Sequence, residues 1–260
     1  MIEKKRTARL MPRHVSHLIE LTWLELKIFL REPMGAIGTV VVPLVLFVVL
    51  GRFLGGRTQT ASANRFVAVD LPVFVVIFIA IGAVLSLTTI IAIYREGGIL
   101  KRLKATPISP LVILSTHVAV KLILTAVTLG LMAVAGRRFY SGSPPPEPLS
   151  FLAGVVLVSV SLLSLGFILA SVIRTARFAQ PIGSILLYAL LGVSGLFFPL
   201  SLLPTGWQMF ALASPITHAV ELLRGLWLGQ GWAAHWVAVL VLLANLVICS
   251  AVSKRVFRWE

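Results

Sequence analysis

Long stretches without a charged side chain constrain the fold of this 260-residue chain more than any other feature. A helix needs about 20 apolar residues to cross the hydrocarbon core of a bilayer. Five uncharged stretches are about that long or longer: Pro33–Gly51, Leu71–Tyr94, Pro148–Ile173, Phe178–Val220 and Gly225–Ser253. A further stretch, Ala105–Gly136, is interrupted only by Lys121. Because lipid cannot hydrogen-bond an open backbone, these stretches predict an all-α polytopic membrane protein.

We expect six membrane-spanning helices. The stretch Phe178–Val220 is too long for a single crossing, and Pro199 and Pro204 divide it. The division leaves a fifth span followed by one or two short helices within 200–228, which we interpret as re-entrant external helices between spans five and six. The predicted spans are 35–54, 71–93, 112–135, 150–173, 179–198 and 232–252.

The segment before the first span predicts an amphipathic helix. Apolar residues recur at three- and four-residue spacing over His14–Arg31, with Trp23 on the apolar side. Such a helix lies in the membrane interface, although a soluble cap helix has the same pattern. Glu32-Pro33 then ends it, and Pro33 can start the first span. We therefore divide the chain into a cytoplasmic N-terminal segment, 1–34, and a six-span transmembrane domain, 35–260.

The net charge of +14 is distributed as a topology signal. Cations gather at the ends of the chain and in short loops between spans: Lys4–Arg13, Arg95–Lys104, Arg174, Arg177 and Lys254–Arg258. Loops rich in Lys and Arg stay in the cytoplasm, next to anionic lipid headgroups. The pattern predicts that both termini are cytoplasmic, and it argues against nucleic acid as a partner. The first apolar stretch starts late for a signal peptide, so we expect it to be retained as a span.

No motif for catalysis, cofactor binding or metal binding is present. The chain has no G-x-x-x-x-G-K-[ST] phosphate-binding loop and no metal-binding His or Cys pair, and Cys249 is its one cysteine. The fourth-span serines Ser159, Ser161 and Ser164 have no His or Asp nearby in sequence, so we expect backbone hydrogen bonds or helix packing for them. The chain is therefore not predicted to be an enzyme. Buried carboxylates for an ion-coupled carrier are absent too, so its energy must come from another protein.

The basic segment between the second and third spans is where such energy would enter. Gly97-Gly98 permits a sharp bend after the helix that ends near Glu96. The turn Ile99–Lys104 then alternates apolar and basic residues, and Pro107 and Pro110 lead into the next span. One side of this turn can dock on a partner, and the other can face water or acidic groups.

At these residues the chain resembles the membrane subunits of type-2 ATP-binding-cassette (ABC) exporters. The resemblance implies a coupling helix, at about 95–107, that docks on the ATPase subunit through Glu96, Gly97, Gly98, Leu100, Lys101, Arg102, Leu103, Lys104, Thr106 and Pro107. It implies a connecting helix marked by Trp23, Arg31, Glu32 and Pro33, and an external re-entrant region with Pro199, Pro204, Trp207, Pro215, Glu221 and Arg224. Ser214 is a departure, because the family often has Asn before this proline.

The resemblance implies a drug-export-like permease subunit in a bacterial inner membrane. Its cargo would be lipophilic or amphipathic, such as a drug, a lipid or a polyketide. Its partners would be two ATPase subunits, which hold ATP and Mg, a second copy or similar permease, and membrane lipid.

Several alternatives stay open at this point. An ABC permease can export a polysaccharide or lipid-linked glycan. An ion-coupled carrier or channel would work without ATP, and a membrane-embedded enzyme of lipid metabolism would need a catalytic cluster. Glu221 and Arg224, three residues apart, would either form a pair on the helix surface or help to gate the cargo.

Overall fold

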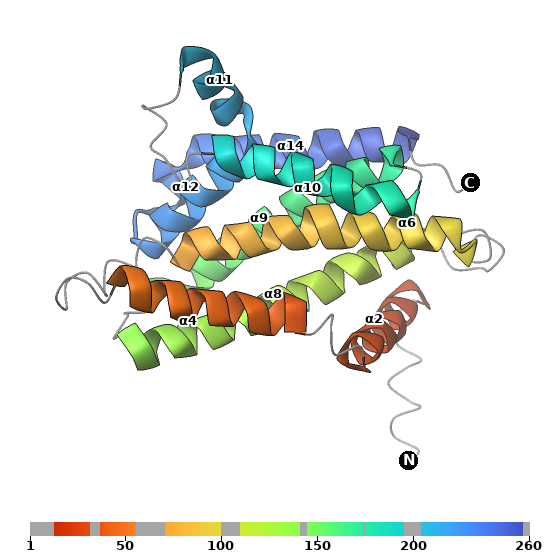
Figure 1. Ribbon diagram of the computed structural model, residues 1–260, viewed down its shortest axis with the longest axis horizontal. Helices are drawn as coiled ribbons and strands as arrows, with labels where there is room; N and C mark the ends of the chain where they lie inside the picture. The colour runs from red at the N-terminus through yellow and green to blue at the C-terminus, as the bar shows by residue number, and fades with distance from the viewer. Residues whose placement is uncertain are drawn as a thin grey trace.

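The computed structural model describes residues 13–31, 37–55, 71–99, 110–140, 145–173, 175–194 and 204–256. Every regular element in these ranges is a helix (Figure 1). Five helices are long and apolar enough to cross a membrane: Leu71–Glu96, Ser115–Phe139, Pro148–Val172, Ala176–Val193 and Trp236–Ser253. The all-α prediction is confirmed for the described residues. The first predicted span corresponds to a shorter apolar helix, Ile37–Val49.

The long helices form a bundle, and further helices lie at each of its two ends (Figure 1). The elements are α2 (Arg13–Arg31), η1 (Ile37–Val41), α4 (Val42–Gly55), a helix over 71–81, η2 (Gly82–Leu87), α6 (Thr88–Glu96), α8 (Pro110–Tyr140), α9 (Pro148–Val172), α10 (Ala176–Val193), α11 (Thr205–Ala213), α12 (Pro215–Trp227), α13 (Gly231–Ala234) and α14 (Trp236–Val256). Figure 1 shows α2 beside the end of the bundle that holds α6, while α11 and α12 lie at the other end. The predicted short helices between the last two spans correspond to α11 and α12.

Two of the apolar helices contain a π-helical segment. The segment η1 ends immediately before α4, whose second residue is Pro43. Proline lacks an N–H group and its ring collides with the carbonyl of residue i−4, so a widened turn accommodates it. The segment η2 interrupts the second span, and Gly82 is its first residue. Both π segments line the cavity described below, through Thr39 and Gly82.

The helix α9 is at the centre of the core. It packs against α14, η2, α12 and α6. Ser161 holds α9 to α14, because its hydroxyl donates to the Leu242 carbonyl at 2.9 Å and the Asn245 amide donates to both Ser161 oxygens at 3.0 Å. Hydrogen bonds of this kind hold membrane helices together where the hydrophobic effect contributes little. The expectation that the serines of this span bond backbone or pack between helices is confirmed for Ser161 and Ser164.

Gly166 permits the closest approach in this core. A Cβ at this position would collide with the backbone carbonyl of Ala83 in η2. The Gly166 carbonyl also accepts the Thr88 hydroxyl at 3.3 Å. The second and fourth spans are therefore in backbone contact at the π turn.

We expect Gly166→Ala to destabilise the protein by about 1–3 kcal/mol, because α9 must move away from η2. Denaturation in detergent, followed by circular dichroism, measures this change. Gly130→Ala is the matched control, since nothing lies within 4 Å of the added methyl group. Gly130→Ala should be neutral or stabilising by up to about 1 kcal/mol. Equal effects of the two substitutions would contradict the contact between α9 and η2.

Candidate functional site

Three consecutive side chains at the end of α6 each bond a different element. The Tyr94 hydroxyl donates to Glu25 Oε1 of α2 at 3.0 Å. Arg95 Nη1 donates to the carbonyl of Ile173, the residue that caps α9, at 3.0 Å. Glu96 Oε1 accepts the backbone N–H of Ala176, the first residue of α10, at 3.0 Å. Successive residues of a helix point about 100° apart, so this end of α6 is held from three directions. We call these three residues the α6 junction.

The chain turns sharply just after this junction. Gly97 caps α6, and its N–H bonds the Ile93 carbonyl at 2.9 Å. Gly98 has a φ of +65°, in the left-handed region that glycine adopts at little cost. The double glycine was predicted to bend the chain here, and its second residue has the conformation that such a bend requires.

Other predicted site residues fall outside the described residues. These are Leu100, Lys101, Arg102, Leu103, Lys104, Thr106 and Pro107 of the coupling segment, Glu32 and Pro33 of the connecting segment, and Pro199 of the external region. Their roles stay predictions.

The connecting helix α2 has the amphipathic character expected of it. It packs against α8, and its Glu25 reaches the α6 junction. Its apolar side chains Ile19, Trp23 and Leu30 are exposed, and Trp23 retains 66% of its accessible area. A row of uncovered apolar residues on a helix at one end of the bundle is typical of a membrane interface. Arg31 is the basic residue in its last turn. Through Tyr94, α2 is therefore bonded to the end of α6 that also holds Glu96, so two parts of the predicted site that are far apart in sequence share one junction.

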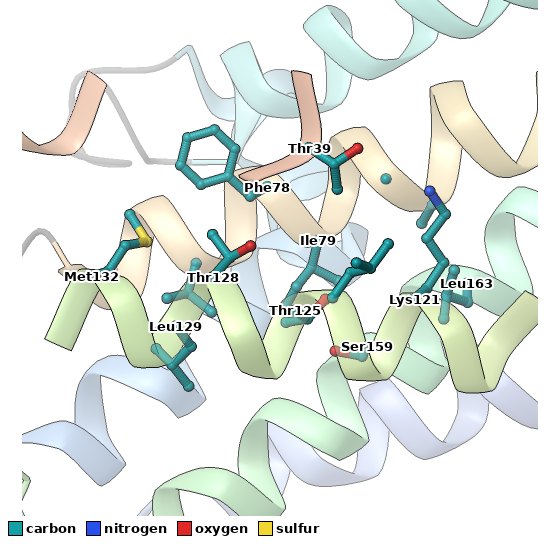
Figure 2. A pocket seen from close by; sticks show the side chains of 14 residues that line it. Thr39, Phe78, Ile79, Lys121, Thr125, Thr128, Leu129, Met132, Ser159 and Leu163 are labelled. Atoms are coloured by element: carbon teal, nitrogen blue, oxygen red, sulfur yellow. The ribbon is translucent and has the colours of Figure 1, made fainter. Parts of the chain in front are cut away.

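Two cavities lie between the second span and α8; the wider one also reaches α2, and the narrower one reaches α9. The wider one has a volume of about 630 Å³, and Glu25, Tyr94, His117 and Gln180 are among its polar lining residues. The narrower one, about 40 Å³, is mainly apolar (Figure 2). Lys121, Thr39 and Leu124 line both cavities.

Lys121 was missed as a site residue by the sequence reasoning. Its Nζ donates to the Ser86 hydroxyl at 2.6 Å, which joins α8 to the π turn η2. The signal that could have identified it is a lone lysine in an otherwise uncharged stretch, because cations inside a membrane span are costly and usually functional.

The described residues of the predicted external region lie on α11, its N-terminal cap and α12, at the opposite end of the bundle from α2 (Figure 1). Pro204 caps α11, Trp207 is exposed on α11, and Pro215 is the first residue of α12. Arg224 lies in the last turn of α12.

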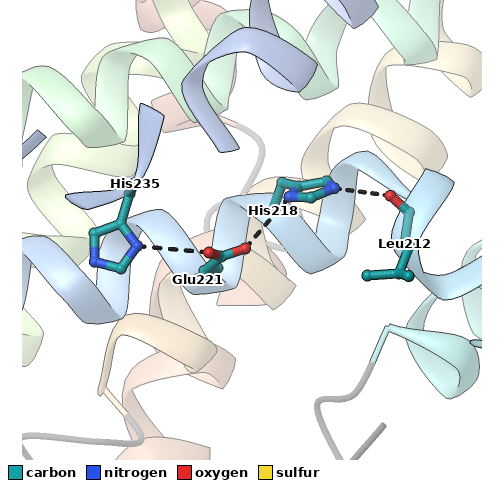
Figure 3. A network of polar contacts seen from close by, with 4 residues as sticks. All are labelled: Leu212, His218, Glu221 and His235. Carbon is teal, nitrogen blue, oxygen red and sulfur yellow. Dashed lines mark hydrogen bonds and ion pairs between the residues drawn. The ribbon is translucent and has the colours of Figure 1, made fainter. Parts of the chain in front are cut away.

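Glu221 has two histidine neighbours that the sequence reasoning did not identify. Its carboxylate lies 3.4 Å from His218 Nδ1 and 3.6 Å from His235 Nδ1 (Figure 3). His218 Nε2 bonds the Leu212 carbonyl at 2.8 Å and His235 Nε2 bonds Gln230 Oε1 at 2.9 Å. In each ring, Nε2 is therefore hydrogen-bonded to a carbonyl oxygen, and Nδ1 faces the Glu221 carboxylate at ion-pair distance. This network ties α11 and the residue before α14 to α12.

Comparisons with known proteins show the family to which this chain belongs. The ABC-2 type transporter family matches residues 16–228, from within α2 to just beyond α12. Proteins from two strains of Mycobacterium tuberculosis, each described as a probable doxorubicin resistance ABC transporter permease protein DrrC, are 27% identical to this chain over 235 residues. The alignments cover 85% of this chain and 80% of each relative. The resemblance to type-2 ABC membrane subunits is thereby confirmed, and the chain belongs to the ABC-2 type transporter family as a membrane permease subunit.

Proposed function

We propose that this permease is the membrane half of an ATP-driven exporter and that the α6 junction receives the movement of an ATPase subunit. The family implies an ATPase partner and pairing of permeases. The complex would hold two ATPase subunits, which bind ATP and Mg, and a second copy of this chain or a similar permease. The single observation that carries the proposal is the set of three hydrogen bonds made by Tyr94, Arg95 and Glu96.

Six spans with both termini in the cytoplasm fit the arrangement. The continuous helix formed by η1 and α4 approaches the length that a crossing requires, and it supplies the first span. The helix α2, the end of α6 and the C-terminal end of α14 lie toward the same end of the bundle (Figure 1). Arg31, Arg95 and Arg255 lie there, as the positive-inside rule expects for the cytoplasmic side of a bacterial inner membrane.

In the proposed cycle, the segment 95–107 docks on the ATPase subunit. Leu100 and Leu103 provide the apolar side of the contact, and Lys101, Arg102 and Lys104 pair with acidic groups. Movement of the part of this segment beyond Gly98 reaches the α6 junction through two residues, Gly97 and Gly98. Because the junction bonds α2, the cap of α9 and the start of α10, the movement is passed to the first, fourth and fifth spans together. Trp23 holds α2 at the interface, and Glu32-Pro33 joins α2 to the first span.

A lipophilic or amphipathic cargo fits the cavities better than a glycan. Their lining is mainly apolar, whereas a polysaccharide path needs many hydrogen-bonding side chains. The relatives are described as doxorubicin resistance permeases, which supports a drug-like cargo. An ion-coupled carrier needs carboxylates within its spans. Among the described spans, the one acidic side chain is that of Glu96, at the end of α6.

We expect Glu96→Ala, and separately Lys101→Ala combined with Arg102→Ala, to abolish the stimulation of ATP hydrolysis by cargo. Loss of the Glu96 carboxylate frees the start of α10, and loss of the two cations weakens docking. The measurement is the ATPase activity of the reconstituted permease–ATPase complex with and without amphipathic drugs, a set that includes compounds with a carboxylate.

The control for these variants is Glu20→Ala, which removes a carboxylate exposed on α2. Co-purification of the ATPase subunit shows that each complex is still assembled. Normal stimulation of ATP hydrolysis in Glu96→Ala would contradict the coupling role of the junction. Uphill transport by the permease alone would overturn the ATP-driven function itself.

Tyr94→Phe tests the bond to α2 separately. It removes the hydroxyl but keeps the ring that packs 5.5 Å from the His117 ring. We expect the ratio of stimulated to basal hydrolysis to fall several-fold, and Glu25→Ala to add little to Tyr94→Phe, because both remove the same hydrogen bond. Tyr188→Phe, at an exposed tyrosine of α10, should have no effect. Additive losses in the double variant would show that the two residues act independently.

A further inference from the structure

Lys121 is a cation without a described counter-charge inside a membrane span. It lies six residues after Ser115, or about 9 Å along the helix from the start of the span. Its Nζ has three protons to donate and bonds the Ser86 hydroxyl. No carboxylate of the described residues forms an ion pair with it. A charge in surroundings of low dielectric constant is stabilised by an opposite charge, so the site favours an anion.

Space for such an anion lies on both sides of Lys121. The wide cavity extends from it toward α2, and the narrow cavity extends the other way, between α8 and the second span. Figure 2 shows Lys121 at one end of the narrow cavity and Met132 at the other. The side chains Phe78, Ile79 and Leu163 make its wall apolar.

Two residues that line these cavities each have a buried polar atom without a hydrogen-bond partner among the described residues. Ser159 lines the narrow cavity, and its Oγ is buried, with 1% of the residue exposed. His117 lines the wide cavity, one helical turn before Lys121, and its Nε2 is buried as well. Buried polar atoms are nearly always hydrogen-bonded, so these two atoms leave room in the hydrogen-bonding pattern for a ligand or water beside Lys121.

Glu25 is the acidic residue that lines the wide cavity, and its position limits the ligand. Its carboxylate accepts the Tyr94 hydroxyl at the α2 end of the cavity, so it is already engaged there. The charges of the cavity are thus separated: negative near α2, and positive where the two cavities meet. An anionic group fits the Lys121 end, next to the Ser86 hydroxyl.

We propose that Lys121 and Ser86 bind the carboxylate or phosphate of an amphipathic anion, whose apolar part fills the adjoining cavities. The inference rests on the proposed function and narrows its cargo class, although a phospholipid of the bilayer offers the same chemistry. Lys121 donates to the anionic oxygens, Ser86 adds its own hydroxyl proton, and the apolar walls hold the tail. A neutral or cationic amphiphile of equal tail length lacks the first of these interactions.

The test is photolabelling of the permease–ATPase complex without ATP, by palmitic acid with a diazirine in its tail. The alcohol and the trimethylammonium compound with the same tail are the comparison probes. We expect the acid to label α8 and the second span at least tenfold more strongly than the trimethylammonium compound, which is the size of one charge-assisted hydrogen bond.

Lys121→Met should reduce labelling by the acid at least tenfold and leave labelling by the alcohol unchanged. Lys121→Arg keeps the charge and should retain the labelling by the acid. Lys27→Met removes an exposed cation of α2 and is the control. Labelling needs no ATP hydrolysis, so its outcome is separate from that of the coupling variants. Equal labelling by the acid and the trimethylammonium probe, or unchanged labelling in Lys121→Met, would overturn the proposal.

Two further measurements separate the sources of the anion. If it is the cargo, ATP drives the acid across proteoliposomes and Lys121→Met stops this transport. If it is a bilayer lipid, native mass spectrometry detects phosphatidylglycerol bound to the complex and absent from Lys121→Met, and ATP moves none of the acid.

Discussion

The backbone contact between Gly166 and Ala83 is the constraint on which the central packing depends. It brings α9 against the π turn of the second span, and α9 in turn holds α14 and α12. Between membrane helices there is no hydrophobic gain as in water, so close approach of small residues and a few hydrogen bonds must supply the cohesion. Gly166 gives the close approach between α9 and the second span and accepts the hydrogen bond from Thr88. Ser161 and Asn245 give the hydrogen bonds between α9 and α14. The second span is thereby fixed at its middle.

The same span is held again at its C-terminal end, by the α6 junction. Between these two fixed points lies η2, and π turns are places where a helix can change its winding. Ser86 is part of η2 and lies ten residues before Glu96, or about 15 Å along the helix. A movement that starts at Glu96 therefore reaches the wall of the cavity through a single continuous helix.

Sequence reasoning could find what depends on composition along one helix. The apolar stretches predicted the five helices that are long enough to cross a membrane, and the spacing of apolar residues predicted α2. Boundaries shifted by a few residues: α8 continues to Tyr140 beyond the predicted 135, because Arg137 and Arg138 extend the helix outside the apolar stretch. The double glycine after Glu96 was predicted to bend, and Gly98 has a positive φ.

What could not be predicted depends on contacts between helices. Nothing in the sequence near Glu221 indicates His235, which approaches it from the other side of a turn, or the backbone of Ala176 as the partner of Glu96. The surroundings of Lys121 are of the same kind, because the two cavities and the buried polar atoms of His117 and Ser159 come from several helices that are separate in sequence. A charge within an apolar stretch can have a physical role where its surroundings supply polar groups and space, as the Ser86 hydroxyl and the two cavities do for Lys121.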